Sequence, residues 1–342
     1  MKVFKQVIKD LRVKELNYAL LIYTLICSLI TPLISYAEVM PIEPTTSNKR
    51  LAKEGVPHPF FWDVHGSKGE VIHLMGTMHI PDPRWVNLPS SLLKDLDRAD
   101  AVYGELNLTD KEAMSGQLMK LALLSNGDTL EKLIGPKVYK KLDQYLQTRG
   151  QSALFMNGFH PKMAEMTLGL LDAMPLLMSG QPVLDEWLLK RAKKAGKTIG
   201  GIETVDEQIA ALFAGTLEEA KTSLAFTIDL LMKKEKAGIK PFDALFKAYF
   251  SGREEAILSV LEEELKDAPK AQLKAMELLL NARNKVMVKR VIEKIKDAPK
   301  KRQVFAFGVA HFVGEEGIIK LLKNKGYTVL RRYAPTQKKL AE

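Results

Sequence analysis

The spacing of hydrophobic and polar positions changes along the chain and divides it into three parts. Short apolar runs, bounded by glycine and polar turns, lie near the start and near the end, whereas helical spacing fills the centre. The short runs predict a hairpin of residues 60–64 and 70–75, a strand at 101–106, and two late strands at 303–307 and 327–332.

Helical spacing dominates from about 110 to 295, and a short strand at 197–202 follows a glycine turn inside this region. Further helices are predicted at 90–100 and 314–325. The strands therefore lie mainly at the two ends of the chain. We expect an α/β (α+β-like) fold, in which the N- and C-terminal segments build a central mixed sheet around a large helical insertion.

The central region contains a stretch, residues 156–178, that is rich in methionine and leucine. Glu165, Asp172 and Pro175 interrupt it, so it is too short and too broken to span a membrane. A buried core helix is the simplest interpretation. A substrate groove or a dimer face is the alternative.

The N-terminus has the pattern of an export signal. A basic start is followed by an apolar run that ends in Ser35-Tyr36-Ala37, a small-x-small cleavage pattern. We expect a signal peptide at 1–37 and a protein that is periplasmic or secreted. The apolar run is also close to membrane-spanning length, so an uncleaved membrane anchor is the alternative, and contact with a membrane is expected only in that case.

A polar, proline-containing linker at 38–59 is predicted to precede one domain at 60–335, with a tail at 336–342. The chain of 342 residues carries a net charge of +10, but its basic residues are interleaved with acidic ones, so no nucleic-acid partner is expected. The single cysteine, Cys27, lies in the N-terminal apolar run. Disulfides, thiolate metal sites and cysteine nucleophiles are therefore excluded from the domain.

Two G-x-x-H motifs, Gly76–His79 and Gly308–His311, are the first candidates for chemistry. Each motif follows a predicted strand, and they are so far apart in sequence that only the fold brings them together. Glu105 and Glu203 follow glycines at the ends of two further predicted strands. In open α/β sheets ligands bind beyond the carboxyl ends of the strands, where these four side chains are expected.

Two histidines with one or two glutamates form a plausible divalent metal site of the His₂Glu type, which leaves a position open for water. A metal-activated water becomes a nucleophile near neutral pH, and a second carboxylate then serves as the general base. The plainer alternatives are that a strand-end histidine is a hydrogen-bonded structural residue, and that Glu105 caps a helix or pairs with a lysine.

Three other polar positions have structural interpretations. His73 shares a strand face with apolar residues and is expected to be packed, and His160, before a proline, is expected to begin a helix. Arg283 lies in an amphipathic helix at 278–295, where solvated surface is the default, although an arginine facing the crevice would hold a substrate carboxylate.

The chain resembles the TraB/GumN family from about residue 60 to residue 332. The resemblance is carried by five stretches in matching order and spacing: His73–His79, Tyr103–Asn107, Gly201–Thr204 with Gln208, Ala282–Met287, and Val304–Gly314, which continues into Gly317 and Gly326–Val329.

The resemblance implies both a fold and an activity. The family includes the animal Tiki proteins, membrane-anchored metalloproteases that depend on divalent metal and trim the N-terminal end of a secreted signalling protein. By this resemblance His79 and His311 are metal ligands and Glu105 is a ligand or the general base. Glu203 and Arg283 fall on other motif positions and are carried over as catalytic candidates. The implied fold is similar to those of erythromycin esterase and the haem-associated ChaN proteins.

We therefore expect an exported metal-dependent hydrolase, a peptidase by preference, with zinc, manganese or cobalt as its cofactor and a peptide or small molecule as its substrate. The alternative is a non-catalytic periplasmic binding protein for a peptide, haem or another small ligand. A third possibility is a dimeric scaffold whose Met-rich helices form the interface.

Overall fold

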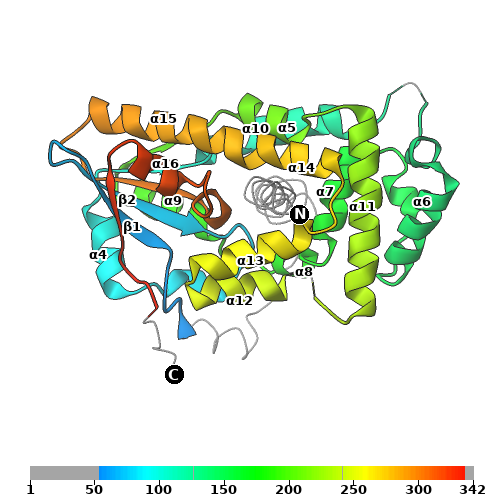
Figure 1. Ribbon diagram of the computed structural model, residues 1–342, viewed down its shortest axis with the longest axis horizontal. Helices are drawn as coiled ribbons and strands as arrows, with labels where there is room; N and C mark the ends of the chain where they lie inside the picture. The colour runs from blue at the N-terminus through cyan, green and yellow to red at the C-terminus, as the bar shows by residue number, and fades with distance from the viewer. Residues whose placement is uncertain (1–53, 126, 241, 336–342) are drawn as a thin grey trace, which may run out of the picture.

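The computed structural model describes residues 54–335 except 126 and 241. It contains a six-stranded mixed sheet with the strand order β4-β3-β5-β2-β1-β6 (Figure 1). The strands are β1 (Phe61–His65), β2 (Val71–Thr77), β3 (Ala101–Gly104), β4 (Thr198–Gly201), β5 (Gln303–Gly308) and β6 (Thr328–Arg331). The predicted mixed α/β fold is confirmed.

The helices between and around these strands are α4 (Ser90–Arg98), α5 (Lys111–Ala122), α6 (Leu130–Gln147), α7 (Pro161–Leu171), α8 (Met174–Leu177), α9 (Leu184–Lys194), α10 (Val205–Leu212), α11 (Leu217–Lys236), α12 (Asp243–Ser251), α13 (Glu254–Leu265), α14 (Lys270–Met276), α15 (Ala282–Asp297) and α16 (Ile318–Asn324). A π-helical turn, Glu277–Asn281, joins α14 to α15. Short 3₁₀ turns cover Pro83–Val86, Leu108–Asp110, Ala153–Met156 and Val309–His311.

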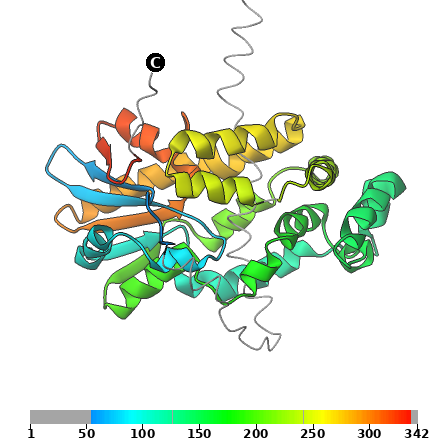
Figure 2. The same ribbon diagram turned by 90° about the horizontal axis from the view of Figure 1, so that it is seen from below.

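The four strands β4, β3, β5 and β2 run parallel, and β1 pairs antiparallel with β2 and with β6. Strand β5 inserts between β3 and β2, and every one of its residues is buried. This agrees with the near-continuous apolar run typical of a strand covered on both faces. Helices α4 and α9 lie on one face of the sheet, and α15 and α16 lie on the other (Figure 2).

The helical insertion extends away from the sheet, so the sheet lies at one end of the molecule and α6 at the other (Figure 1, Figure 2). Leu142, Leu146, Leu168, Leu224 and Ile228 belong to a core of its own, formed by α6, α7 and α11. Residues 161–171 of the Met-rich stretch form α7, most of whose residues are buried, so the core-helix interpretation is confirmed for this part of the stretch. The same stretch lines a pocket of about 760 Å³.

One helix begins later than the sequence predicts. Helix α16 begins at Ile318 rather than at 314, because Gly314 has a φ of 82° and interrupts helical geometry. Among the described residues no helix is both long and apolar enough to cross a bilayer. The predicted signal peptide at 1–37, the tail at 336–342 and most of the linker lie outside those residues.

Candidate functional site

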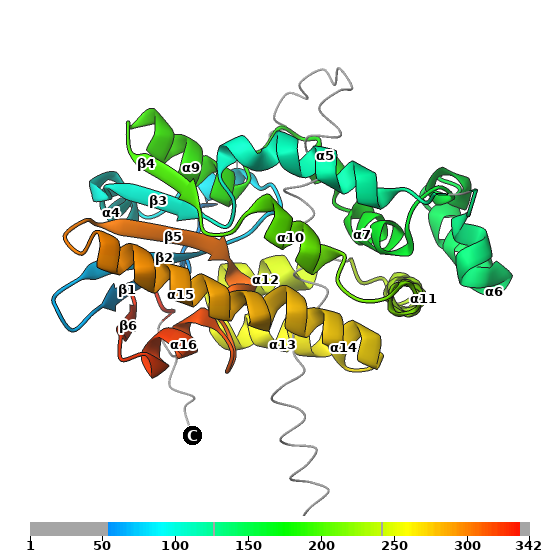
Figure 3. The same ribbon diagram turned by 90° about the horizontal axis from the view of Figure 1, so that it is seen from above.

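Four of the five predicted site residues follow the ends of four neighbouring parallel strands. His79 lies two residues after β2, Glu105 one residue after β3, Glu203 two residues after β4, and His311 three residues after β5. Because parallel strands end at the same edge of a sheet, this topology delivers all four side chains to one crevice, and α15 passes beside the same edge (Figure 3).

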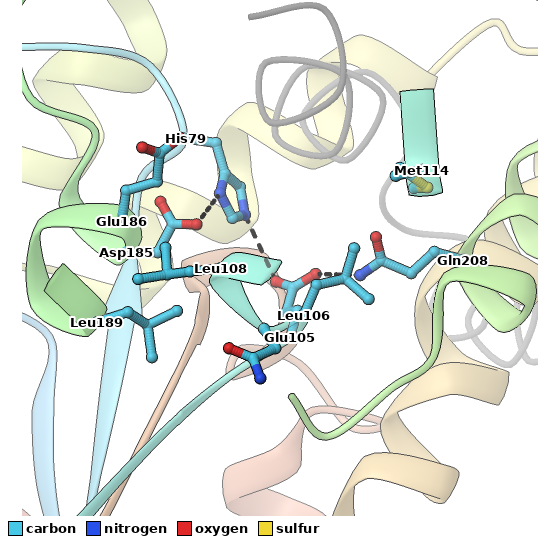
Figure 4. A pocket seen from close by; sticks show the side chains of 10 residues that line it. His79, Glu105, Leu106, Leu108, Met114, Asp185, Glu186, Leu189 and Gln208 are labelled. Carbon is cyan, nitrogen blue, oxygen red and sulfur yellow. Dashed lines mark hydrogen bonds and ion pairs between the residues drawn. The ribbon is translucent and has the colours of Figure 1, made fainter. Parts of the chain in front are cut away.

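Both histidines face the same carboxylate oxygen. Nε2 of His79 lies 3.5 Å from Oε1 of Glu105, and Nε2 of His311 lies 3.7 Å from that atom. The three side chains are 3%, 1% and 7% exposed for His79, His311 and Glu105, so bulk water does not screen the cluster. Figure 4 shows the His79 ring between the carboxylates of Glu105 and Asp185.

The far nitrogen of each imidazole faces an oxygen. Nδ1 of His79 lies 3.1 Å from Oδ2 of Asp185, and Nδ1 of His311 lies 2.6 Å from Oδ1 of Asn284. The side-chain amide of Asn284 is oriented by the hydrogen bond that its Nδ2 donates to the carbonyl of Glu316, at 2.8 Å. Since a carboxylate and an oriented amide oxygen only accept, both Nδ1 atoms carry a ring hydrogen, and in the neutral form of each imidazole Nε2 presents a lone pair to Glu105.

When both imidazoles are neutral, their Nε2 atoms and Oε1 of Glu105 converge as acceptors, an arrangement that a proton or a metal cation between them stabilises. His79 has no well-aligned hydrogen bond at either nitrogen. A Cβ added at Gly308 would lie 3.2 Å from Nε2 of His79, 3.4 Å from Oε1 of Glu105 and 3.7 Å from Cδ2 of His311. The absence of a side chain at Gly308 thus keeps the space between the three groups open. Two imidazoles and one carboxylate suit zinc, manganese or cobalt.

The metal ligands would have to draw together to complete such a site. Among residues 54–335, leaving out 126 and 241, no group of three or more His, Cys, Asp or Glu side chains already has the arrangement of a metal-binding cluster. The donor types and the open space fit a divalent ion, which His79, His311 and Glu105 would hold.

The electrostatics of the cluster also favour a cation. Burial alone would lower the pKa of His79, but the carboxylates of Asp185 and Glu105 outweigh it and raise this pKa to about 10. Burial lowers the pKa of His311 to about 3. Burial would raise the pKa of Glu105, but the adjacent imidazoles and Arg283 hold it well below its usual range. Without a metal, His79 thus carries a second ring hydrogen, on the Nε2 that faces Glu105, and His311 is neutral.

Arg283 is buried in this crevice, so its default interpretation as solvated surface is wrong. It is 6% exposed, and it donates from Nε to Oε1 of Glu203 at 2.8 Å and from Nη2 to Oε2 of Glu105 at 2.9 Å. Its Nη1 donates to the carbonyl of Leu279, in the π-helical turn, at 3.0 Å. Amphipathic spacing counts arginine as polar, whereas here two carboxylates stabilise the buried guanidinium.

Three further residues at the site were missed by reasoning from the sequence. Asp185 belongs to the first turn of α9, where an acidic residue is common at any helix and gives no particular signal. Gln208, in α10, donates to Glu203 at 3.2 Å and to Glu105 at 3.4 Å, although the sequence had marked it only as part of a family stretch. Asn284 lies within the stretch Ala282–Met287 that carries the family resemblance, but no role was predicted for it.

A small cavity of about 40 Å³ opens beside His79 and Glu105, with room for a few water molecules (Figure 4). Its lining mixes polar and apolar side chains. The lining residues are His79, Glu105, Leu106, Asn107, Leu108, Met114, Asp185, Glu186, Leu189 and Gln208.

The remaining predicted histidines lie elsewhere. His73 is 8% exposed in β2, where its Nδ1 lies 2.8 Å from Oδ1 of Asp63 and its ring stacks on Phe61, as expected for a packed residue. His160 is the N-cap of α7, and its Nδ1 accepts from the backbone N–H of Lys162 at 3.1 Å, as expected for a helix-entry residue.

Comparison with known proteins gives one family. The model of the TraB/PrgY/gumN family matches residues 60–331. The chain is 28% identical over 302 residues to a protein named metalloprotease TIKI homolog from Nematostella vectensis, covering 75% of this chain and 64% of the relative. It is 26% identical to metalloprotease TIKI1 of Danio rerio, covering 79% and 62%. It is 25% identical to metalloprotease TIKI1 of Homo sapiens, covering 84% and 64%.

The chain thus spans slightly less than two thirds of the length of these relatives. No solved structure matches it. The similarity to the folds of erythromycin esterase and ChaN therefore stays a prediction.

Proposed function

The chain belongs to the TraB/PrgY/gumN family, and on that premise we propose that it is a metal-dependent hydrolase that cleaves peptide bonds. The observation that carries the proposal is the convergence of His79 Nε2, His311 Nε2 and Glu105 Oε1 on a buried space beside a cavity. The relatives' names, which describe metalloproteases, support the choice of a hydrolase and of a metal.

His79, His311 and Glu105 would hold the metal, which we propose is zinc, manganese or cobalt. A divalent ion there would polarise a carbonyl oxygen and lower the pKa of water, the chemistry on which metal-dependent hydrolysis depends. The cavity beside His79 has room for water, and Leu106, Leu108, Leu189 and Met114 contribute apolar surface to its lining.

Glu105 is better suited to hold the metal than to move a proton. Its Oε1 accepts from the backbone N–H of Gly308 at 2.8 Å, and its Oε2 accepts from Arg283 and Gln208. Burial alone would raise the pKa of Glu105, but the adjacent imidazoles and Arg283 hold it well below its usual range, which makes Glu105 a weak base near neutral pH. Of the two roles that the sequence left open for this residue, ligand is the one we propose.

Arg283 and Glu203 support the ligand. Arg283 bridges the two carboxylates, so it fixes Glu105 in one orientation and balances its charge. Glu203 in turn balances Arg283 and accepts from Gln208. We propose that both act by holding Glu105 rather than by touching the substrate.

We further propose that the chain is exported through residues 1–37 and works in the periplasm or outside the cell, or on a membrane if that segment is retained. A peptide fits this location and the family, and a small-molecule substrate is the alternative. No nucleic-acid partner is proposed, and a dimer through the Met-rich helices stays a prediction from the sequence.

Metal content and cleavage of a peptide library test the proposal together. The purified protein is loaded with zinc, manganese or cobalt and desalted, and the bound metal is quantified by mass spectrometry. We expect about one equivalent and metal-dependent cleavage. Both should be lost in the His79→Ala/His311→Ala variant and kept in a matched His58→Ala/His65→Ala variant, which removes two histidines that lie outside the site.

The outcomes separate the alternatives. Retained metal or ligand with no cleavage of any peptide would favour a non-catalytic binding protein. Negligible metal in both histidine variants and in the parent would reject the metal-dependent mechanism.

A further inference from the structure

The two histidines differ in the group that faces their Nδ1 atoms. Asp185 places a carboxylate 3.1 Å from Nδ1 of His79, whereas Asn284 places a neutral amide oxygen 2.6 Å from Nδ1 of His311. A carboxylate behind an imidazole increases its basicity and fixes the hydrogen on the far nitrogen, and a neutral amide fixes the hydrogen without adding charge.

From this asymmetry we propose that Asp185 is a positioning residue that makes His79 the stronger of the two imidazole ligands and thereby sets the metal affinity of the site. The proposal rests on the proposed function, because it presumes a metal between His79, His311 and Glu105. It concerns the strength of one ligand and not the chemistry of the substrate.

The place of Asp185 in the fold is consistent with a fixed orienting group. It belongs to the first turn of α9, where the helix dipole stabilises a negative charge, and α9 packs against β3 and β4. The segment before α9 is fastened to the loop after His79, because the backbone N–H of Asp82 donates to the carbonyl of Pro182 at 3.2 Å. The carboxylate and the imidazole are therefore held by two connected segments.

The loop after His79 is itself rigidly held. Asp82 caps the 3₁₀ turn and accepts from Nε and Nη2 of Arg84 at 2.8 and 2.7 Å. The guanidinium of Arg84 lies 3.5 Å from the ring centre of Phe250, and Trp85 donates to the carbonyl of Ile80 at 2.8 Å. These contacts restrict the backbone that carries His79, so a change of the Asp185 side chain acts on the imidazole and not on the loop.

One oxygen of the Asp185 carboxylate has no hydrogen-bond partner. Its side chain is 17% exposed, and its second oxygen, Oδ1, is buried without a hydrogen-bond partner. A buried carboxylate oxygen without a partner is unfavourable unless the charge serves another purpose. We propose that the Asp185 charge supports the His79 imidazole when that imidazole binds a cation. A cation at Nε2 makes the Nδ1–H a stronger donor to the carboxylate.

The test measures metal affinity, independently of catalysis. Zinc affinity is determined by competition with a chelator, and the visible absorption of the cobalt-loaded protein reports the ligand geometry, for the parent, Asp185→Asn and Asp185→Ala. We expect Asp185→Asn to lose about 10- to 100-fold in affinity and to change the cobalt spectrum. Asp243→Asn, which removes an exposed first-turn carboxylate from α12, is the matched control and should behave as the parent.

A second measurement reports the role directly. Ring-nitrogen NMR of the ¹⁵N-histidine-labelled protein should show the hydrogen of His79 on Nδ1 in the zinc-loaded parent, and a mixed or altered state in Asp185→Asn. Thermal unfolding establishes that the variant is folded, and the isosteric asparagine preserves the shape of the site if the alanine variant does not fold.

The results separate this proposal from the proposed function. If the parent binds metal and Asp185→Asn matches its affinity, cobalt spectrum and ring-nitrogen shifts, the role of Asp185 is rejected while the metal site stands. If affinity falls as expected but no peptide is cleaved, Asp185 is supported and the hydrolase is not. If the parent binds neither zinc nor cobalt, both proposals fail.

Discussion

The backbone N–H of Gly308 donates a 2.8 Å hydrogen bond to Oε1 of Glu105, although 203 residues separate them in the chain. One glycine therefore joins the ends of β3 and β5, and it also lines the space between the two histidines. The same residue contributes a donor that fixes the carboxylate and a missing side chain that leaves room for an ion.

Replacement of Gly308 by alanine should fill that room. The new Cβ would lie 3.2 Å from Nε2 of His79, so we expect metal affinity to fall by about tenfold or more, because overpacking of this kind costs about 1–3 kcal/mol. Chelator competition measures the effect. Gly158→Ala, where a Cβ would meet nothing within 4 Å, is the control and should leave the affinity unchanged.

The role of Glu105 as ligand or as base is decided by Glu105→Gln. If Glu105 binds the metal, the variant should lose most of the bound metal, because a neutral amide is a much weaker ligand for a hard divalent ion than a carboxylate. If Glu105 acts only as a base, the metal stays and cleavage alone is lost. Mass spectrometry of the desalted protein distinguishes these results, with the exposed Glu218→Gln as a control.

Removal of Arg283 should destabilise the fold. Arg283→Met leaves Glu105 and Glu203 buried without their cation, and breaking one partner of a buried charge network costs about 3–5 kcal/mol in the free energy of unfolding. Urea denaturation measures this cost. Lys285→Met, on the same helix with a side chain that is 57% exposed, should change the stability by less than about 1 kcal/mol; equal losses for the two variants would contradict the assignment.

One pH dependence follows from a pair near the site. The guanidinium of Arg290 lowers the pKa of Glu207 to about 2, and the backbone N–H of Thr204 contributes to the same shift. Since the folded pKa lies below the unfolded value of about 4.3, the stabilisation is complete above that value and is lost as the pH falls toward about 2.

The measurement compares denaturation of the parent and Glu207→Gln between pH 6 and pH 3. We expect the parent to lose about 1 kcal/mol more than the variant, a modest figure because the Glu207 side chain is 39% exposed and solvent screens the pair. Parallel pH profiles for the two proteins would show that this pair does not contribute.

Metal should also stabilise the folded protein. At a metal concentration about 100 times the dissociation constant, binding to the native state alone adds about 2.7 kcal/mol to the free energy of unfolding. Thermal unfolding with and without zinc should therefore show an increase of several degrees in the parent. The His79→Ala/His311→Ala variant should show no such increase, and a chelator should reverse the increase in the parent.

Much of the site could be predicted from the sequence because of where its residues stand. His79, Glu105, Glu203 and His311 each follow a short apolar run, and the rule that parallel strands end at one edge places them together without knowledge of the strand order. The order itself, with β5 between β3 and β2, depends on contacts between segments far apart in sequence, which local patterns do not contain.

The site residues that the sequence did not identify share one physical cause. The sequence pattern around Arg283 indicates a surface residue, because it does not contain the two carboxylates that pair with it. Asp185 has the pattern of an ordinary first-turn acid, because the pattern does not contain His79. A side chain whose meaning depends on a partner from another element has no signal of its own in the periodicity of the chain. Domain boundaries and the roles of the site residues stay predictions.

The order in which the strands are synthesised has a consequence for folding. Strand β5 lies in the middle of the sheet, yet it leaves the ribosome after β1 to β4, and β2 and β3 are joined in the sheet only through it. An N-terminal fragment that stops before Gln303 lacks His311, the Gly308 donor and the strand that joins β2 to β3. Chains that stop before Gln303 are therefore unable to bring His79, Glu105 and His311 together.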